Sequence, residues 1–242
     1  MNIEDQGFIL DKRMLGERSL LVTILSSQHG LIKGALNSSR SKKLERNVQV
    51  GNLVEFTWQA RLLEHLGTFK IELLRPISFK IFSSQFKILM LQSLFTVLTI
   101  SLPEGIEENQ IYLEIEKFIK NLGSLENTMI DYLNLEITIL TQVGYQIDLQ
   151  TCAVTNKCEK LFYISPKSGR AVTQEAGHKY HDQLFIIPDY FYEHRPINYQ
   201  EFLDGLKITG HFLQKNIFHH KNIAMPSSRV NLIDYVQKHT DI

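Results

Sequence analysis

One stretch of the sequence decides the fold class: Ser19-Leu20-Leu21-Val22-Thr23-Ile24-Leu25, followed by the polar turn Gln28-His29-Gly30. A run of leucine and β-branched residues that stops at a turn containing glycine is typical of a strand. A second short apolar run, residues 31–36, follows the turn directly. This rhythm predicts a small all-β module.

Three further runs of the same kind extend the module on both sides. Residues 7–10 precede the first stretch, and residues 53–58 and 68–73 follow it with partial alternation of apolar and polar side chains. Five strands within about 70 residues, with Gly and Ser at the turns, favour a small closed or nearly closed barrel. We expect an OB-fold, because it is the most economical five-stranded barrel.

Helical periodicity replaces this rhythm up to about Tyr145. Apolar residues recur at steps of three and four, which predicts helices over about 82–97, 111–122 and 131–142. The segment Leu102-Pro103-Glu104-Gly105 separates the first two, because proline and glycine end helices.

The rest of the chain combines an irregular segment with two more helices. Residues 152–189 hold the strand-like run Leu161-Phe162-Tyr163-Ile164 between turn signals. Pro196 precedes one helical pattern, and Pro226-Ser227-Ser228 opens another. The predicted fold class is therefore α+β, with a five-stranded barrel followed by a mainly helical domain that carries a small irregular or β insertion.

The composition is that of an ordinary globular protein. The 242 residues are 43% hydrophobic and carry 26 Lys+Arg against 26 Asp+Glu, with a pI near 7.1. Zero net charge excludes a uniformly basic coat, but it allows a basic patch that is balanced by an acidic region elsewhere.

Other protein classes are excluded by short features of the sequence. The longest apolar-rich run, residues 88–102, is shorter than the about 20 residues that a membrane span needs. Glu4 and Asp5 stand where a signal peptide has its basic region, so we expect none. Two cysteines cannot form a disulfide framework and indicate a reducing cytoplasm. The sequence has none of the motifs of nucleotide-binding loops, zinc proteases or serine hydrolases.

The most informative local feature is a basic loop that follows the third predicted strand. Between strands three and four of an OB barrel, such a loop favours contacts with nucleic-acid phosphates that read no sequence. A solvated surface loop is the alternative. Arg13, Lys33 and Arg61 are candidate DNA-binding residues of second rank, because the direction in which their side chains point depends on the strand register. The loop has a net charge of +4 over 14 residues, because Glu45 stands against Lys33, Arg40, Lys42, Lys43 and Arg46.

The helical zone has the opposite charge. Between Glu104 and Glu136, eight acids stand against two lysines, a balance of −6. We expect this stretch to form a solvated face or a protein contact, and not to touch DNA.

Aromatic residues of the barrel matter because strand binders stack bases on aromatic rings. Phe56 and Trp58 lie two residues apart in one predicted strand, and Phe69 lies in the next. We expect Phe56 and Phe69 in the core. Trp58 has Arg61 as a neighbour and lies either in the core or beside a groove, and we do not predict stacking on it.

Two cysteines and two histidines are candidate metal ligands. Cys152 and Cys158 are spaced C-x5-C, and His178 and His181 are spaced H-x2-H. Structural zinc sites more usually contain C-x2-4-C pairs. We therefore expect no metal or other cofactor, and interpret these residues as free thiols and surface histidines.

Several segments resemble the bacterial recombination mediator family RecO, in the version seen in alphaproteobacteria. The resemblance covers nearly the whole chain in order, and this collinearity is what makes it specific. The matching segments are Gly7 to Leu10, Gly16 to Ser19, Lys33-Gly34-Ala35, Gly51-Asn52-Leu53, Trp58 to Gly67, Val143-Gly144-Tyr145, Cys152 to Thr155, Ser165 to Val172 and Met225 to Arg229.

The resemblance implies a non-enzymatic DNA-repair protein. Members of this family bind single- and double-stranded DNA and anneal complementary strands. With RecR they help load RecA onto DNA coated by single-strand-binding protein (SSB), whose acidic C-terminal tail they contact. The resemblance thus implies a cytoplasmic, nucleoid-associated protein with no membrane contact and no small-molecule substrate.

The resemblance also gives the domains. Many members carry a four-cysteine zinc site, but here only Cys152 falls where a first ligand belongs, and Glu175-Ala176-Gly177 replace the second pair. We therefore expect the insertion to lack an intact zinc site. The predicted domains are 1–77 (OB-fold, DNA-binding), 78–150 (helical, first part), 151–195 (irregular or β, a degenerate zinc-finger region) and 196–242 (C-terminal helices that pack on the helical domain).

A second basic group lies in the C-terminal zone. We expect it to widen the path of the DNA or to receive the acidic tail of SSB. Its net charge is +3, because Glu201 and Asp204 stand against Arg195, Lys207, Lys215, Lys221 and Arg229.

Two other classes of function stay open. A helical adaptor whose barrel binds protein predicts that charge reversal in residues 40–46 leaves its activity unchanged. A small hydrolase predicts turnover and a pocket with convergent polar groups.

Overall fold

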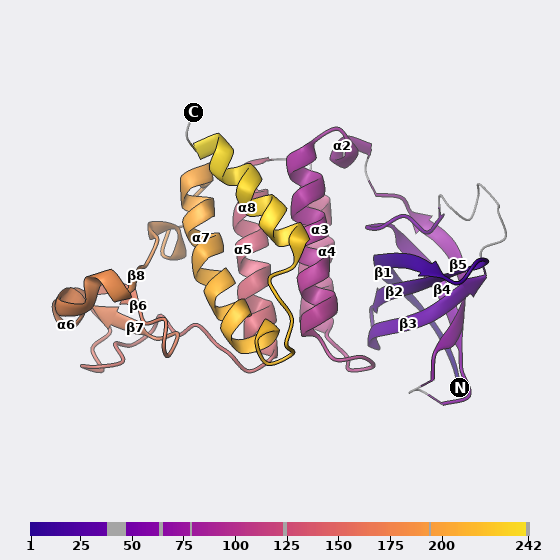
Figure 1. The fold of residues 1–242 in the computed structure, drawn as a ribbon, viewed down its shortest axis with the longest axis horizontal. Coiled ribbons are helices and arrows are strands. Elements are labelled where there is room, and N and C mark those ends of the chain that lie inside the picture. Colours follow the sequence, from indigo (N-terminus) through magenta and orange to yellow (C-terminus); the bar gives the residue numbers. More distant parts are fainter. Residues whose placement is uncertain (38–46, 63–64, 78, 123–124, 194, 241–242) are drawn as a thin grey trace. The chain divides into compact units, whose positions relative to one another are not determined.

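The computed structural model describes residues 1–37, 47–62, 65–77, 79–122, 125–193 and 195–240, and it is shown in Figure 1. The chain divides into two compact units, Met1–Gly123 and Ser124–Ile242. The predicted α+β class is confirmed, because a barrel of strands is followed by helices and a small sheet. The domain boundaries predicted at residues 77, 150 and 195 stay predictions.

Five strands form the closed barrel in the order β1-β2-β3-β5-β4, so the predicted strands are confirmed. All neighbours are antiparallel except β3 and β5, which pair in parallel. A bulge between Ile9 and Asp11 bends β1, which lets its first half pair with β4 and its whole second half with β2. The strands are β1 (Asn2–Leu15), β2 (Ser19–Ser26), β3 (Gly30–Asn37), β4 (Leu53–Gln59) and β5 (Gly67–Arg75).

Aromatic side chains fill the barrel. Phe56 and Phe69 are buried and meet edge to face, with ring centroids 5.5 Å apart, so their expected core position is confirmed. Trp58 is also buried, and its indole N–H donates to the backbone oxygen of Lys33 at 2.9 Å. Gly67 lies against the Trp58 ring, where a Cβ would come within 2.2 Å. Trp58 is therefore a core residue and offers no ring for bases to stack on.

The first unit continues with helices α2 (Phe79–Phe82), α3 (Gln85–Ser101) and α4 (Asn109–Asn121). The Ser84 side chain accepts from the Lys87 N–H and starts α3, and the chain leaves the helix at Leu102-Pro103. The Tyr112 ring of α4 packs on Phe8 of β1, with centroids 5.4 Å apart. The two helices predicted here are confirmed.

The second unit consists of three long helices and a small sheet. α7 lies beside both α5 and α8 (Figure 1), and the sheet has the order β7-β6-β8. No helix in the described part of the chain is long and apolar enough to cross a lipid bilayer. The elements are α5 (Leu125–Gln142), β6 (Leu161–Ile164), β7 (Ala171–Thr173), α6 (Gln174–Gly177), the 3-10 helix η1 (His178–Gln183), β8 (Phe185–Ile186), the 3-10 helix η2 (Asp189–Phe191), α7 (Tyr199–Leu213), the π-helix η3 (Gln214–Phe218) and α8 (Ser227–Thr240).

Local sequence explains where α7 begins. The Asn198 side chain accepts from the Glu201 N–H, and the Glu201 carboxylate accepts from the Asn198 N–H, each at 2.9 Å. This reciprocal pair satisfies two backbone donors at the helix start. The predicted helix after Pro196 is thus confirmed, as is the helix that Pro226 precedes.

The acidic stretch is solvated only in part, because Glu104 and Glu107 are exposed while two other acids are buried. Glu136 and Asp131 are buried in the second unit, and Glu136 is paired with Arg229. Glu116 pairs with Arg75, and Glu104 pairs with Lys33 of the barrel. Glu114 accepts a hydrogen bond from Gln110 at 3.1 Å, so five of the eight acids are paired, hydrogen-bonded or buried among the described residues. Charge counting along the chain cannot reveal this.

Candidate nucleic-acid interface

The strand register places Arg13 and Lys33 on one face of the barrel wall. Directly paired residues of antiparallel strands point to the same side. Arg13 pairs with Leu21, which pairs with Ala35, and the next row joins Thr23 to Lys33. The alternate residues of β2, Val22 and Ile24, belong to the barrel core. The two cations therefore lie on the outer face of β1, β2 and β3, which settles the facing that the sequence leaves open.

Arg40, Lys42, Lys43 and Arg46 lie outside the described residues. The structure describes the chain on both sides of them. β3 ends at Asn37, which pairs with Ser19 where the β1–β2 turn ends. The described end of β3 thus lies beside that turn.

The β1–β2 turn adds a basic residue that the sequence reasoning missed. Arg18 is exposed there, between Glu17 and the first residue of β2. Its position in a turn, next to a strand that carries a basic residue, is the sequence feature that could have identified it. Arg61 is exposed at the start of the β4–β5 connection. In OB-folds, the connections β1–β2 and β4–β5 border the surface that binds oligonucleotides.

A cleft of about 390 Å³ opens on the same face, at Lys33. The Lys33 ammonium lies 2.6 Å from the Glu104 carboxylate, an ion pair in which the Glu104 side chain is more than half exposed. The side chains of His65 and Leu66 from the β4–β5 connection line the cleft together with Leu21 and Leu31. Apolar walls next to a cation suit a nucleotide better than a free ion.

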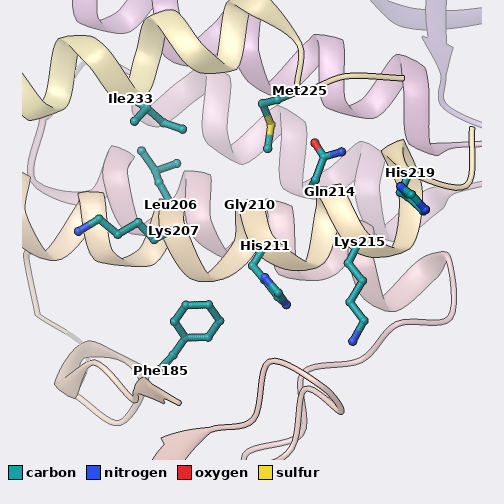
Figure 2. A pocket seen from close by; sticks show the side chains of 10 residues that line it. All are labelled: Phe185, Leu206, Lys207, Gly210, His211, Gln214, Lys215, His219, Met225 and Ile233. Atoms are coloured by element: carbon teal, nitrogen blue, oxygen red, sulfur yellow. The ribbon is translucent and has the colours of Figure 1, made fainter. Parts of the chain in front are cut away.

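A second concave surface lies on α7 in the other unit, with a volume of about 700 Å³ (Figure 2). Figure 2 shows His211 of α7 and Lys215 of η3 projecting to the side on which Phe185 lies, whereas the Lys207 side chain extends along the helix. The ring of His211 meets Phe185 at a centroid distance of 5.4 Å. The surface is mainly apolar with a basic border, and we call it the α7 groove. It is lined by Phe185, Leu206, Lys207, Gly210, His211, Gln214, Lys215, His219, Met225 and Ile233.

Hydrogen bonds fix the basic residues of the α7 groove. Lys215 donates to the backbone oxygens of Pro166 and Lys167 at 3.0 and 2.7 Å, and His211 lies 3.1 Å from the same Pro166 oxygen. Carbonyl oxygens orient the ammonium of Lys215 but do not neutralise its charge. Lys207 lies 2.9 Å from Asp204, so its charge is offset.

Two members of the second basic group, Lys207 and Lys215, line the α7 groove, and Arg229 does not. The prediction that Arg229 belongs to an exposed patch is wrong, because its side chain is fully buried against Glu136. Arg195 forms a bidentate pair with Glu201. Lys221 is exposed but does not line the groove.

The sulfur of Cys152 lies among three backbone N–H groups. It accepts from the N–H groups of Val154, Thr155 and Thr173 at 3.3 to 3.4 Å. Burial raises the pKa of this thiol, but hydrogen bonds from Thr155, Thr173 and Val154 outweigh burial and lower the pKa to about 6.

These residues do not fit the four-cysteine zinc site of the resemblance. Threonines stand at the neighbouring positions 155 and 173, and Cys158 is exposed. His178 and His181 are exposed, with ring centroids 6.3 Å apart. Over the described ranges, no three His, Cys, Asp or Glu side chains are arranged to hold a metal ion.

Comparison with known proteins gives one consistent family. Residues 1–77 match the family model described as Recombination protein O N terminal, and residues 84–222 match that described as Recombination protein O C terminal. The chain is 34% identical over 241 residues to the DNA repair protein RecO of Bartonella quintana (strain Toulouse), and 33% identical over 237 residues to that of Rickettsia akari (strain Hartford), with 98% of both chains covered in each case. It is 33% identical over 231 residues to the DNA repair protein RecO of Orientia tsutsugamushi (strain Ikeda), covering 93% of this chain and 94% of that one.

Proposed function

The chain belongs to the RecO family of DNA repair and recombination proteins, and we propose that it binds single- and double-stranded DNA on the outer face of its barrel and anneals complementary strands. With RecR it helps load RecA onto DNA coated by SSB. In this role it binds and positions strands in the cytoplasm, at the nucleoid, and performs no covalent chemistry.

One observation carries the DNA-binding part of this proposal. The register places Arg13 and Lys33 on one outer face, and Arg40, Lys42, Lys43 and Arg46 follow the end of β3 in the sequence. An annealing protein must offset the repulsion between two phosphate backbones and leave the base edges free. A shallow basic face next to a basic loop meets both requirements, whereas a deep pocket would enclose the bases.

The α7 groove supports contact with the acidic tail of SSB. Its walls contain Phe185, Met225 and Ile233, and Lys215 keeps an unneutralised charge at its border. Apolar walls and a fixed cation are complementary to an acidic peptide that also carries apolar residues.

The test of DNA binding is fluorescence anisotropy with a labelled single strand of about 30 nucleotides, titrated over a range of salt concentrations. If four or five phosphates are neutralised, log K falls against log salt with a slope of roughly −3 to −4.5. Changing Arg40, Lys42, Lys43 and Arg46 together to Glu should weaken binding strongly and leave the melting temperature nearly unchanged.

A control variant keeps the same change in net charge. It replaces Lys157, Lys160, Lys167 and Lys179 by Glu, all of which are exposed in the other unit. If both variants weaken binding equally, the effect comes from net charge and the loop assignment fails. If the unmodified protein does not bind DNA at the lowest practical salt, the adaptor function replaces the one proposed here.

A further inference from the structure

The structure points to a feature of the Lys33 cleft that neither charge counting nor family membership assigns. We propose that this cleft is a subsite for one backbone phosphate of a DNA strand, and that the Glu104 carboxylate occupies the place of that phosphate in the free protein. DNA then binds at Lys33 by exchange with Glu104. The inference rests on the proposed function, because it assumes that the barrel binds DNA.

The segment that carries Glu104 is fixed to β3 through its main chain. The N–H of Gly105 donates to the oxygen of Leu31 at 2.9 Å, and Glu104 forms a parallel bridge with Leu31. Gly30 has a positive φ of 64°, and a Cβ at this position would lie 1.7 Å from the backbone oxygen of Ile106. This close approach needs glycine. The segment therefore keeps its position without the Glu104 side chain.

Lys33 is equally fixed on the other side of the pair. Its backbone oxygen accepts the indole N–H of Trp58, and it pairs with Thr23 in the β2–β3 ladder. The Lys33 side chain thus projects from a fixed point of the backbone on the outer face. Any anion that binds it there lies in the same row of the sheet as Thr23, next to the row of Arg13.

The Lys33–Glu104 pair is suited to exchange. The Lys33 side chain is 31% exposed and the Glu104 side chain is 57% exposed, so water reaches both groups. Ion pairs at this exposure are weak. A phosphate of DNA brings a further gain that a single carboxylate lacks, because its condensed counterions are released into solution. DNA can therefore displace the carboxylate without breaking the main-chain contacts of the segment.

The surroundings fit a nucleotide rather than an isolated phosphate. Leu21, Leu31 and Leu66 line the cleft next to Lys33, together with His65 and the core residues Ile32 and Trp58. Such walls accept the sugar and base that belong to the bound phosphate.

The experiment compares Glu104→Gln with Glu107→Gln in the full chain. Glu107 is exposed in the same segment and makes no ion pair among the described residues, so both variants lose one negative charge. Anisotropy with a labelled strand of about 30 thymidines at fixed low salt measures the affinity of each. We expect Glu104→Gln to bind about two- to fivefold more tightly than the unmodified protein, and Glu107→Gln to stay closer to it.

The Lys33→Gln background separates exchange from a general effect of charge. Without the Lys33 ammonium, Glu104 and the DNA phosphate no longer compete for one cation. Glu104→Gln should then change the affinity for DNA no more than Glu107→Gln does. Equal effects of the two glutamine variants in the presence of Lys33 overturn the inference while DNA binding itself stands. Absence of binding by every protein, including the unmodified one, overturns the proposed function and the subsite with it.

Discussion

The guanidinium of Arg229 lies 2.5 Å from the carboxylate of Glu136, and both side chains are fully buried. This pair joins α8 to α5 across 93 residues of sequence. Arg229 also donates to the backbone oxygen of Leu206 at 2.8 Å, and Thr209 donates to Glu136 at 2.5 Å. Three helices of the second unit thus meet at one charged, hydrogen-bonded centre.

Breaking this pair from one side should destabilise the protein strongly. Arg229→Met leaves the Glu136 carboxylate buried without its partner, which we expect to cost about 3–5 kcal/mol in the free energy of unfolding. Replacing both residues by Met should cost less, because no uncompensated charge stays in the interior. Urea unfolding of the single and double variants measures the difference. A double variant as unstable as Arg229→Met would show that packing and not charge determines the loss.

The loss in Arg229→Met should also grow with pH. Burial raises the pKa of Glu136, and removing Arg229 takes away the nearby charge that opposes this effect. The native state of the variant then holds a proton that the unfolded state releases, so its stability falls as the pH rises above the ordinary range of a carboxyl group. Urea unfolding near pH 5 and near pH 8 provides the check, with the larger loss expected near pH 8.

Cys152 predicts a pH dependence of the opposite sign. Its pKa of about 6 is below the ordinary value of 9.0 for a thiol. Between these values the unfolded state binds one more proton than the native state, so the thiolate stabilises the protein increasingly as the pH rises. The stability difference between the unmodified protein and Cys152→Ser should therefore increase from pH 6 to pH 9, by at most about 1.4 kcal/mol per pH unit. A difference that is constant over this range would contradict a native thiolate.

Gly67→Ala should disturb the barrel core. A Cβ at Gly67 would lie 2.2 Å from the ring of Trp58, so the indole must move and lose its hydrogen bond to Lys33. We expect a loss of about 1–3 kcal/mol and a shift of the fluorescence emission, which reports on the barrel because Trp58 is the single tryptophan. Gly144→Ala is the control, because its φ of 87° imposes strain where no atom lies within 4 Å of the new Cβ. It should lose stability without changing the emission.

Adjacent residues of β1 test the assignment of the outer face. Arg13 is exposed on this face, whereas Lys12 pairs with Val22 of the core row and its ammonium lies 3.4 Å from Gln49. If Arg13 contacts one phosphate, Arg13→Gln should reduce the slope of log K against log salt by about 0.7 to 0.9, and Lys12→Gln should leave it unchanged. Equal slopes for the two variants would show that Arg13 does not contact a phosphate.

Lys215 tests the α7 groove. Lys215→Glu places a negative charge at the border of the groove. It should lower the affinity for a labelled peptide with the C-terminal sequence of the host SSB by about tenfold or more. Lys179→Glu makes the same change in charge at an exposed site that does not line the groove, and should leave peptide affinity within about twofold. Loss of affinity in both variants would show that the peptide responds to overall charge.

Local signals were sufficient for the five barrel strands and for the presence of the long helices. The strands around residues 19–36 and the helix that Asn198 starts follow from short-range periodicity, turns and caps, which act over a few residues and are visible in the sequence. Phe56 and Phe69 were predictable as core residues for the same reason. The buried and paired acids of the acidic stretch were not predictable, because a charged residue looks the same in sequence whether it is solvated or paired.

The sequence by itself determined a five-stranded barrel followed by helices, and a basic loop next to the third strand. The tertiary structure alone decided which of the described charges are buried and paired and which face solvent. Arg229 finds its partner 93 residues away and is buried, and Lys33 finds Glu104 at a separation of 71 residues. Pairing over such separations depends on how the elements pack, because the free energy of an ion pair follows from distance and solvent exposure, and neither is written in the local sequence.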